Sequence, residues 1–431
     1  MRLILTLLLV SCGGDDTNGP GDAGADARAV DATAGDAGAD GLADGTPDGV
    51  PADGMLDGIP DDAPGGSPDG PVDAARVDGA LPADAGECTP CSSCAWLLEP
   101  ADTVGAEGLY TSVVYAGDGT VHVSYLQADG VLRHAQRPPG GAWTAEDIDD
   151  TGWAASHTSI AAGADGTLVV SYYDIFNLDL RLATRPTPSA PWTHELVAGT
   201  GAVGNYNSVA IDGDGGVHLA YYDATNADLI YAYRPADGTT FAAQTVDSTG
   251  AVGTYSAITV EGSTVHIAYR DNSNSDIKHA VSLPTGGFMT EPVDQAGILG
   301  LYIDIDANAA GEVVISYMDD SNDDLKVAQF LPASGWTPRT VDSAGQVGSF
   351  TGVALDEDGV AHVAYRADTG LDLKLAEGPA SGPFDVTFLE TTDDVGRFAA
   401  LALGPRGQLA VSYYDFTHQD LRVATRDGTC P

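Results

Sequence analysis

The stretch "LAYYDATNADLIYA", residues 219–232, decides the fold. It consists of an apolar run that ends in Tyr-x-Asp, a loop of small and polar residues, and a second apolar run. Regular repeats of 20 to 50 residues are typical of solenoids, propellers or arrays. The tyrosine of this pattern recurs at intervals of 47 to 49 residues, at Tyr125, Tyr172, Tyr221, Tyr269, Tyr317, Tyr365 and Tyr413.

Each repeat contains four short segments of strand character separated by turn residues. From Tyr206 onwards these are "YNSVAID", "GVHLAYYD", "DLIYAYR" and "FAAQTV", joined by "GDG", "ATNA" and "PADGTT". No helical periodicity is present. Four antiparallel strands per repeat is typical of a propeller blade, so the sequence predicts an all-β, seven-bladed β-propeller. We name the strands of a blade A to D from the centre outwards.

The order of the segments predicts how the ring closes. A first strand D, at Trp96, precedes the first strand A, and the last repeat stops after its strand C at "LRVATRDGTCP". The N-terminal strand should therefore complete the last blade, which removes free sheet edges. An aromatic residue opens each strand D, and fourteen residues later another opens the next strand A, except in one repeat, where His157 stands there. We expect φ > 0 at one turn position between them, which is occupied by Gly105, Gly152, Gly201, Gly250, Gly297, Gly345 and Asp393.

The chain begins with "MRLILTLLLVSC", whose apolar run is too short to span a bilayer as a helix. The ending "LVSC" resembles the lipobox of bacterial lipoprotein signal peptides. The resemblance implies a signal peptide at residues 1–11 and lipidation of Cys12. Gly13 directly after this cysteine implies sorting to the outer membrane, where the protein would face the periplasm or the cell surface. An ordinary secretory signal is the alternative.

Residues 12–87 are dominated by Asp, Gly, Ala and Pro, and should form a disordered acidic stalk, because such a segment buries too little apolar surface to fold. The propeller is expected at residues 88–431. The whole chain of 431 residues has 63 acidic and 18 basic side chains. This balance excludes nucleic acid as a natural partner. We expect a monomer.

Four cysteines besides Cys12 lie near the two ends of the predicted propeller. Cys94 and Cys430 flank the point where the last blade breaks off and resumes, so the sequence predicts a disulfide between them in an exported protein. The pairing among Cys88, Cys91 and Cys94 stays open. A thiolate metal cluster formed by the same residues is the alternative.

Several ionisable residues recur at one position of the repeat, which favours a structural role. For four strand-B histidines we expect hydrogen bonds between blades: His122, His218, His266 and His362. For the strand-C cations we expect ion pairs with Asp of a neighbouring blade: Arg133, Arg181, Lys278, Lys326, Lys374 and Arg422. Two rows of Asp bracket the B–C loops and should close turns. Calcium is the alternative ligand at these oxygens, at Asp174, Asp179, Asp223, Asp228, Asp271 and Asp276.

One repeat departs from the others on its loops. Trp153 replaces small or polar residues of the D–A loop, and the B–C loop "DIFNLD" carries Ile175, Phe176 and Leu178, with Tyr173 just before it. An apolar cluster on a polar loop face predicts a binding surface. The alternative is a local minicore in which Trp153 packs over Phe176.

The propeller half, residues 95–431, resembles the broad group of secreted seven-bladed β-propellers and, more loosely, the sialidase-like BNR-type repeat families. The resemblance rests on the form of the repeat: "SVAIDGDGGVH" has the Ser and the Asp-Gly turn of a sialidase Asp-box at other offsets. A sialidase would also need three central arginines, and only Arg270 and Arg366 are placed to approach the centre. We therefore expect a non-enzymatic propeller that binds a protein or glycan. The alternative is a glycosidase or lyase that acts on extracellular polysaccharide.

Overall fold

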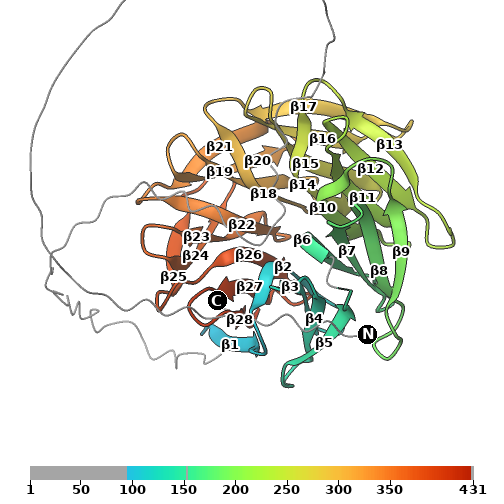
Figure 1. The fold of residues 1–431 in the computed structure, drawn as a ribbon. Coiled ribbons are helices and arrows are strands. Elements are labelled where there is room, and N and C mark those ends of the chain that lie inside the picture. Colours follow the sequence, from blue (N-terminus) through green and yellow to red (C-terminus); the bar gives the residue numbers. More distant parts are fainter. Residues whose placement is uncertain (1–94, 152–153, 429–431) are drawn as a thin grey trace, which may run out of the picture. The chain divides into compact units, whose positions relative to one another are not determined.

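The structure, a computed structural model, describes residues 95–151 and 154–428. These residues form seven antiparallel sheets of four strands each, arranged as blades around a common centre (Figure 1). The predicted seven-bladed β-propeller is confirmed. Within this part of the chain, no helix has the length and apolar character needed to cross a membrane.

The blades share one order of strands, A to D from the centre outwards. The A strands are β2 (Glu107–Tyr115), β6 (Ala154–Ala162), β10 (Val203–Ile211), β14 (Val252–Glu261), β18 (Leu299–Ala307), β22 (Val347–Leu355) and β26 (Arg397–Leu403). The B strands are β3 (Val121–Gln127), β7 (Leu168–Asp174), β11 (Val217–Asp223), β15 (Thr264–Asp271), β19 (Val313–Asp319), β23 (Val360–Ala367) and β27 (Leu409–Asp415).

The two outer strands of each blade complete this order. The C strands are β4 (Leu132–Arg137), β8 (Asp179–Arg185), β12 (Asp228–Arg234), β16 (Asp276–Ser282), β20 (Asp324–Leu331), β24 (Asp372–Pro379) and β28 (Asp420–Arg426). The D strands are β5 (Thr144–Asp149), β9 (Thr193–Ala198), β13 (Ala242–Asp247), β17 (Phe288–Asp294), β21 (Gly335–Asp342), β25 (Asp385–Glu390) and, in the seventh blade, β1 (Leu97–Asp102).

The ring closes as the sequence predicts. Strand β1 pairs antiparallel with β28, in a register that runs from Leu97 opposite Thr425 to Asp102 opposite Leu421. Figure 1 shows β1 at the outer edge of the blade formed by β26, β27 and β28. The first and last segments of the propeller therefore share one sheet.

The repeated tyrosine connects adjacent blades, which explains why the pattern recurs. It is buried in all seven blades. In six of them its hydroxyl donates a hydrogen bond to a carboxylate at the end of the D strand of the preceding blade. The pairs are Tyr125–Asp102 (2.5 Å), Tyr172–Asp149 (2.7 Å), Tyr269–Asp247 (2.8 Å), Tyr317–Asp294 (2.7 Å), Tyr365–Asp342 (2.6 Å) and Tyr413–Glu390.

The strand-C cations reach the same carboxylates, so the expected ion pairs with Asp of a neighbouring blade are confirmed at four of the six positions, and at a fifth the partner is Glu390. These pairs are Arg133–Asp102 (2.7 Å), Lys278–Asp247, Lys326–Asp294 (2.5 Å), Lys374–Asp342 (2.6 Å) and Arg422–Glu390 (2.8 Å). Arg181 instead pairs with Asp174 of its own blade at 3.4 Å. At these five interfaces the carboxylate thus accepts a hydrogen bond from a tyrosine hydroxyl and pairs with a cation in a largely buried place.

One interface between blades lacks both the carboxylate and the cation. Between the second and third blades the carboxylate position holds Ala198 and the cation position holds Ile230. Both pack with Tyr221 in an apolar core cluster. The carboxylate and the cation are absent together, which avoids an unpaired buried charge.

A collar of seven rings encircles the centre of the propeller. Neighbouring ring centroids are 4.4 to 5.8 Å apart around a closed circuit. All seven residues have φ between 51° and 54° at a β-bulge of strand A. The collar consists of Tyr110, His157, Tyr206, Tyr255, Tyr302, Phe350 and Phe398. Positive φ is also confirmed at the described turn positions Gly105, Gly201, Gly250, Gly297, Gly345 and Asp393.

Two residues beyond the collar, A-strand side chains accept a backbone N–H from the next blade. Serines do so in the first three blades, where Ser112, Ser159 and Ser208 accept N–H groups at 3.1 to 3.2 Å. The fifth blade uses carboxylates: Asp304 accepts from Val353 and Asp306 from Leu355, each at 2.8 Å. Burial raises the pKa of Asp304 to about 7 and that of Asp306 to about 6.

Candidate functional site

The repeated histidines bond within their own blades, so the expectation of bonds between blades was wrong. His122 contacts His134 of the neighbouring strand at 3.0 Å, and His134 contacts Glu146 of strand D at 3.0 Å. His266 begins a similar chain, and His362 contacts Glu377. Strands B and C of one sheet place these side chains on the same face, which is why the bonds stay inside the blade.

The first Asp row closes the B–C turns, as predicted. Asp174 accepts the backbone N–H groups of Phe176 and Asn177 at 3.1 and 3.0 Å, and Asp223 and Asp271 bond their loops in the same way. The second row, Asp179, Asp228 and Asp276, lies directly opposite across the strand pair. Calcium binding at these six residues stays a prediction.

Among the described residues, one group of three side chains has ligand-type atoms within 4.8 Å of one another. It is formed by Asp393, Asp415 and His418, at the seventh blade. His418 Nδ1 lies 2.9 Å from Asp415 and 3.8 Å from Asp393. Asp415 also raises the pKa of His418 through its hydrogen bond, so these contacts describe an ion-paired turn.

The structure separates the residues of the predicted apolar patch. Phe176 and Leu178 are 72% and 42% exposed, Ile175 is half-buried, and Tyr173 is buried on β7. Trp153 lies outside the described residues, so its contact with Phe176 stays a prediction. The same holds for Cys12, Cys88, Cys91, Cys94 and Cys430, which all lie outside the described part of the chain.

Arg366 has a structural role. It is buried and pairs with Asp368 at 2.6 Å and Asp394 at 2.5 Å. Arg397 reaches the other oxygen of Asp394 at 3.1 Å. These arginines are therefore neutralised by carboxylates of the loops that surround them.

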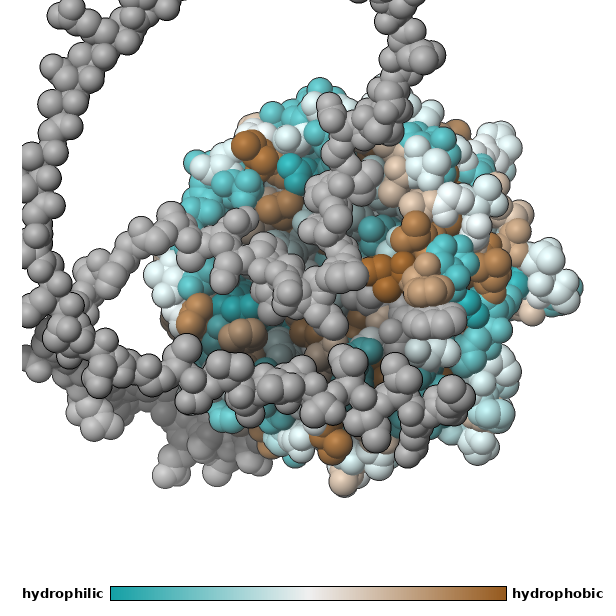
Figure 2. Space-filling model, in the orientation of Figure 1, coloured by the Kyte–Doolittle hydropathy of each residue, from teal (hydrophilic) through white to brown (hydrophobic). Residues whose placement is uncertain are grey.

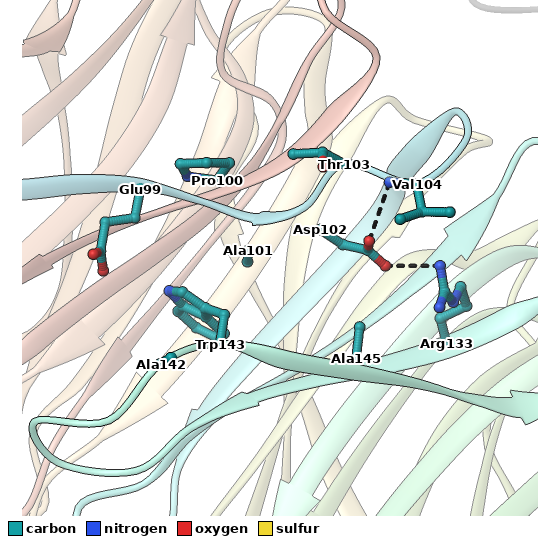
Figure 3. Close-up of a pocket in the computed structure, with 10 residues that line it drawn as sticks. All are labelled: Glu99, Pro100, Ala101, Asp102, Thr103, Val104, Arg133, Ala142, Trp143 and Ala145. Atoms are coloured by element: carbon teal, nitrogen blue, oxygen red, sulfur yellow. Dashed lines mark hydrogen bonds and ion pairs between the residues drawn. The ribbon is translucent and has the colours of Figure 1, made fainter.

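A hollow lies where the seventh blade meets the first. It measures about 630 Å³ and runs between β1 and the β4–β5 pair. We call it the seam groove; it is lined by residues 99–104, Arg133, Ala142, Trp143 and Ala145. Figure 3 shows Glu99 and Trp143 facing each other at one end, and the Asp102–Arg133 pair at the other.

Three kinds of side-chain group lie close together at the tryptophan end of the groove. Trp143 opens strand D and is half-buried, and the guanidinium of Arg137 lies 5.3 Å from the centre of its ring. Arg137 also forms an ion pair with Glu99, which stands on β1 of the seventh blade and is half-buried. An apolar ring, a cation donor and a carboxylate acceptor therefore meet at the surface.

The other end of the groove is rich in carboxylates. Arg133 contacts Asp102 at 2.7 Å, Glu107 at 2.8 Å and Asp147 at 3.0 Å. Burial raises the pKa of Glu107 to about 7 although Arg133 lowers it. Two carboxylates, Glu99 and Asp102, and one cation, Arg133, line the groove, so it favours neutral over anionic ligands.

The set of Glu, Arg and aromatic ring at the groove recurs at four consecutive interfaces. In each case the guanidinium stacks on the ring that opens strand D, at 4.5 to 5.3 Å, and pairs with a glutamate of the preceding blade. The sets are Glu99–Arg137–Trp143, Glu146–Arg185–Trp192, Glu195–Arg234–Phe241 and Glu377–Arg426–Trp96. A hollow opens at the first of them.

From the sequence, we identified the aromatic residue of each set as a marker of the repeat and missed the Glu and the Arg. A signal was present: Arg137, Arg185 and Arg234 follow the repeat spacing at the ends of strands C, and Glu99, Glu146 and Glu195 stand three residues after the strand-D aromatic. The spacing along the chain does not show that the Glu of one blade contacts the Arg of the next blade.

The surface seen in Figure 2 carries apolar residues as small groups among hydrophilic ones. The exposed apolar side chains Val104, Phe176, Ile298 and Phe416 belong to different blades.

No protein-family model and no curated protein matches the sequence. Among solved structures, an ulvan lyase described as a new polysaccharide lyase family superposes with a TM-score of 0.53 and 12% identity, over 74% of this chain and 94% of that one. AofleA from Arthrobotrys oligospora gives 0.48 and 12% identity over 69% and 90%. A fucose-specific lectin from Aleuria aurantia gives 0.47 and 14% identity over 65% and 95%. At these identities the likeness is one of fold, and the sialidase-like resemblance stays a prediction.

Proposed function

We propose that the protein is a non-enzymatic glycan-binding propeller and that the seam groove is its binding site. The observation that carries the proposal is a hollow of about 630 Å³ lined by Trp143 and Glu99, both of which contact the guanidinium of Arg137 beside it. Ligand pockets of about 300–1,000 Å³ that combine apolar surface with a few polar groups are typical small-molecule sites.

A sugar ring suits this combination of groups. The C–H face of a pyranose stacks on an indole, which supplies a large apolar surface. Its hydroxyls can donate to the Glu99 carboxylate and accept from the Arg137 guanidinium, and hydrogen bonds to charged groups are stronger than those between neutral ones. Because Arg137 is already held by Glu99, the two groups are positioned before the ligand arrives.

The charge of the groove selects among glycans. Asp102, Glu107 and Asp147 surround Arg133, and the whole chain has a formal net charge of −45. We therefore infer that the ligand is a neutral glycan and that uronate-rich or sulfated chains are disfavoured. A polysaccharide lyase among the fold neighbours agrees with a glycan ligand, but the proposal depends on the groove.

A glycan array probed with the full-length protein tests the proposal. We expect binding to neutral glycans, and we expect Trp143→Ala to lower the affinity at least tenfold, since losing a buried aromatic contact is worth about 1.5–3 kcal/mol. Phe176→Ala is the matched control, because it removes an exposed aromatic outside the groove. Loss of binding in Phe176→Ala with retention in Trp143→Ala would assign the ligand to the loop patch instead. Shortening of the bound glycans would indicate the enzymatic alternative.

We further propose that the propeller is anchored at the cell envelope through a lipid on Cys12, at the end of the stalk of residues 12–87. The lipobox-like "LVSC" and the composition of the stalk support this placement. Cys12→Ala should move the protein from the membrane fraction to the soluble fraction and abolish incorporation of labelled fatty acid. Unchanged fractionation of this variant would contradict the anchor and leave the glycan site untouched.

A further inference from the structure

A second hollow opens between the third and fourth blades, on the side of the A–B and C–D turns. It measures about 550 Å³ and is lined by aromatic side chains, among them Tyr231, Tyr233 and Phe288. Gly213 and Gly286 stand at its rim, and a Cβ added to either would meet no atom within 4 Å. The hollow is therefore open to solvent at this rim.

The hollow lies at an interface where the repeated ion pair is missing. At the positions that hold Glu195 and Arg234 one interface earlier, the chain has Gln244 and Ser282. Ser282 replaces a long guanidinium by a short side chain, and its hydroxyl accepts the backbone N–H of Val265 at 2.9 Å. The space that an arginine occupies at four other interfaces is left vacant here.

A hydrogen-bonded chain forms one wall of the hollow. Tyr231 Oη lies 2.7 Å from His218 Nδ1, and His218 Nε2 lies 3.0 Å from Asp212 Oδ2. Burial lowers the pKa of His218, so this histidine is neutral near pH 7. The pKa of Asp212 is lowered overall, because the hydrogen bonds from His218 and from the backbone of Gly216 outweigh its burial. Asp212 is therefore an anion that the histidine does not neutralise.

The field in the hollow is negative. Asp212 and Asp214 both line it, and they raise the pKa of the lining residue Tyr233 together with Asp237, after the larger effect of burial. Neither Lys nor Arg occurs among the described residues that line it. This distinguishes it from the seam groove, which contains Arg133.

We propose that this hollow binds a protonated amine carried on a sugar ring, that is, a cationic amino sugar. The ammonium group is attracted by the carboxylate of Asp212 and by the faces of Tyr231 and Tyr233, since tyrosine faces attract cations within about 6 Å of the ring. The sugar body fills the place of the missing arginine and packs against Phe288. An amino sugar thus supplies the positive charge that Arg supplies at four other interfaces.

This site is independent of the seam groove and of the glycan function proposed for it. The two hollows lie at different blade interfaces and share no lining residue. Loss of neutral-glycan binding in Trp143→Ala therefore leaves the amine site intact, and the failure of either proposal can be recognised separately.

Titration of the full-length protein with glucosamine, N-acetylglucosamine and glucose near pH 6.5 tests the proposal. We expect glucosamine to bind at least tenfold more tightly than the two neutral sugars, and its affinity to fall as salt is raised. Equal affinity for all three would show that the charge plays no part and would overturn the proposal. Equal affinity in low and high salt would do the same.

Two variants locate the effect. Asp212→Asn removes the charge but keeps the turn, because Asn308 caps the corresponding turn of the fifth blade through its side-chain oxygen; the glucosamine affinity should fall about tenfold. The double variant Gln244→Glu/Ser282→Arg restores the repeated ion pair, fills the hollow and should abolish binding. The Trp143→Ala variant should bind glucosamine as the natural protein does. Unchanged binding in the double variant would place the amine elsewhere.

Discussion

The buried cluster between the fifth and sixth blades gives a quantitative test of how the blades are held together. Lys374 Nζ and the Tyr365 hydroxyl both lie 2.6 Å from the same oxygen of Asp342. The Lys374 and Asp342 side chains are only 5% and 7% exposed. Asp342→Ala would leave the ammonium buried without a counter-ion and the tyrosine without its acceptor. Breaking such a buried pair costs about 3–5 kcal/mol.

At one interface of the natural protein, apolar residues replace both the carboxylate and the cation. Ala198 and Ile230 occupy the two charged positions at the interface between the second and third blades, where they pack with Tyr221. Adding Lys374→Ile to Asp342→Ala copies this solution and removes the uncompensated charge. We expect the double variant to lie within about 1–2 kcal/mol of the natural protein, the remainder being the unpaired Tyr365 hydroxyl and a small cavity.

Denaturant unfolding followed by circular dichroism measures both variants. For a domain of this size the single variant should also lower the Tm by about 6–10 °C, at roughly 2 °C per kcal/mol. The double variant should recover most of the loss, giving a strongly non-additive cycle. If the double variant is destabilised by the sum of the two single changes, the cluster does not act as a charge-compensated unit and the reasoning is refuted.

Three further predictions concern other parts of the chain. Burial raises the pKa of Asp304 to about 7. The folded protein therefore binds more protons than the unfolded chain between pH 4 and 7, so the contribution of Asp304 to the free energy of unfolding falls as the pH rises. Asp304→Ser, which copies Ser208, should remove about 1–2 kcal/mol of the stability difference between pH 4 and pH 8, after allowance for the partial exposure of Asp304 to solvent; an unchanged slope of stability against pH would contradict this. Phe176→Ala should change the Tm by no more than about 2 °C because the ring is 72% exposed, and a large drop would indicate a minicore with Trp153. Non-reducing peptide mapping should link Cys430 to the segment containing Cys88, Cys91 and Cys94; a free Cys430 thiol would contradict the predicted disulfide.

The fold could be predicted because its determinants are local and repeated. The tyrosine of each blade, the turn glycines and the early strand at Trp96 all follow from spacing along the chain. The contact between Tyr125 and Asp102 also follows the repeat, since the acceptor precedes each tyrosine by 22 or 23 residues. Even the exception at Ala198 and Ile230 is visible in the sequence once the pairing is known.

The seam groove, the proposed binding site, could not be predicted in the same way. Glu99, Arg137 and Trp143 recur with the repeat, so they were indistinguishable from scaffold residues. Whether an interface is filled or hollow depends on how two sheets pack against each other. The hydrogen bonds of His122 were misjudged for a related reason: the face that a strand side chain occupies decides whether it meets its own blade or the next.

The proposed function is tested most directly by a crystal structure of the full-length protein with the best neutral ligand from the array. The account predicts a sugar ring in the seam groove, stacked on Trp143, with hydroxyls within hydrogen-bond distance of Glu99 and Arg137. A ligand seated instead on the loop that carries Phe176, with an empty seam groove, would contradict it.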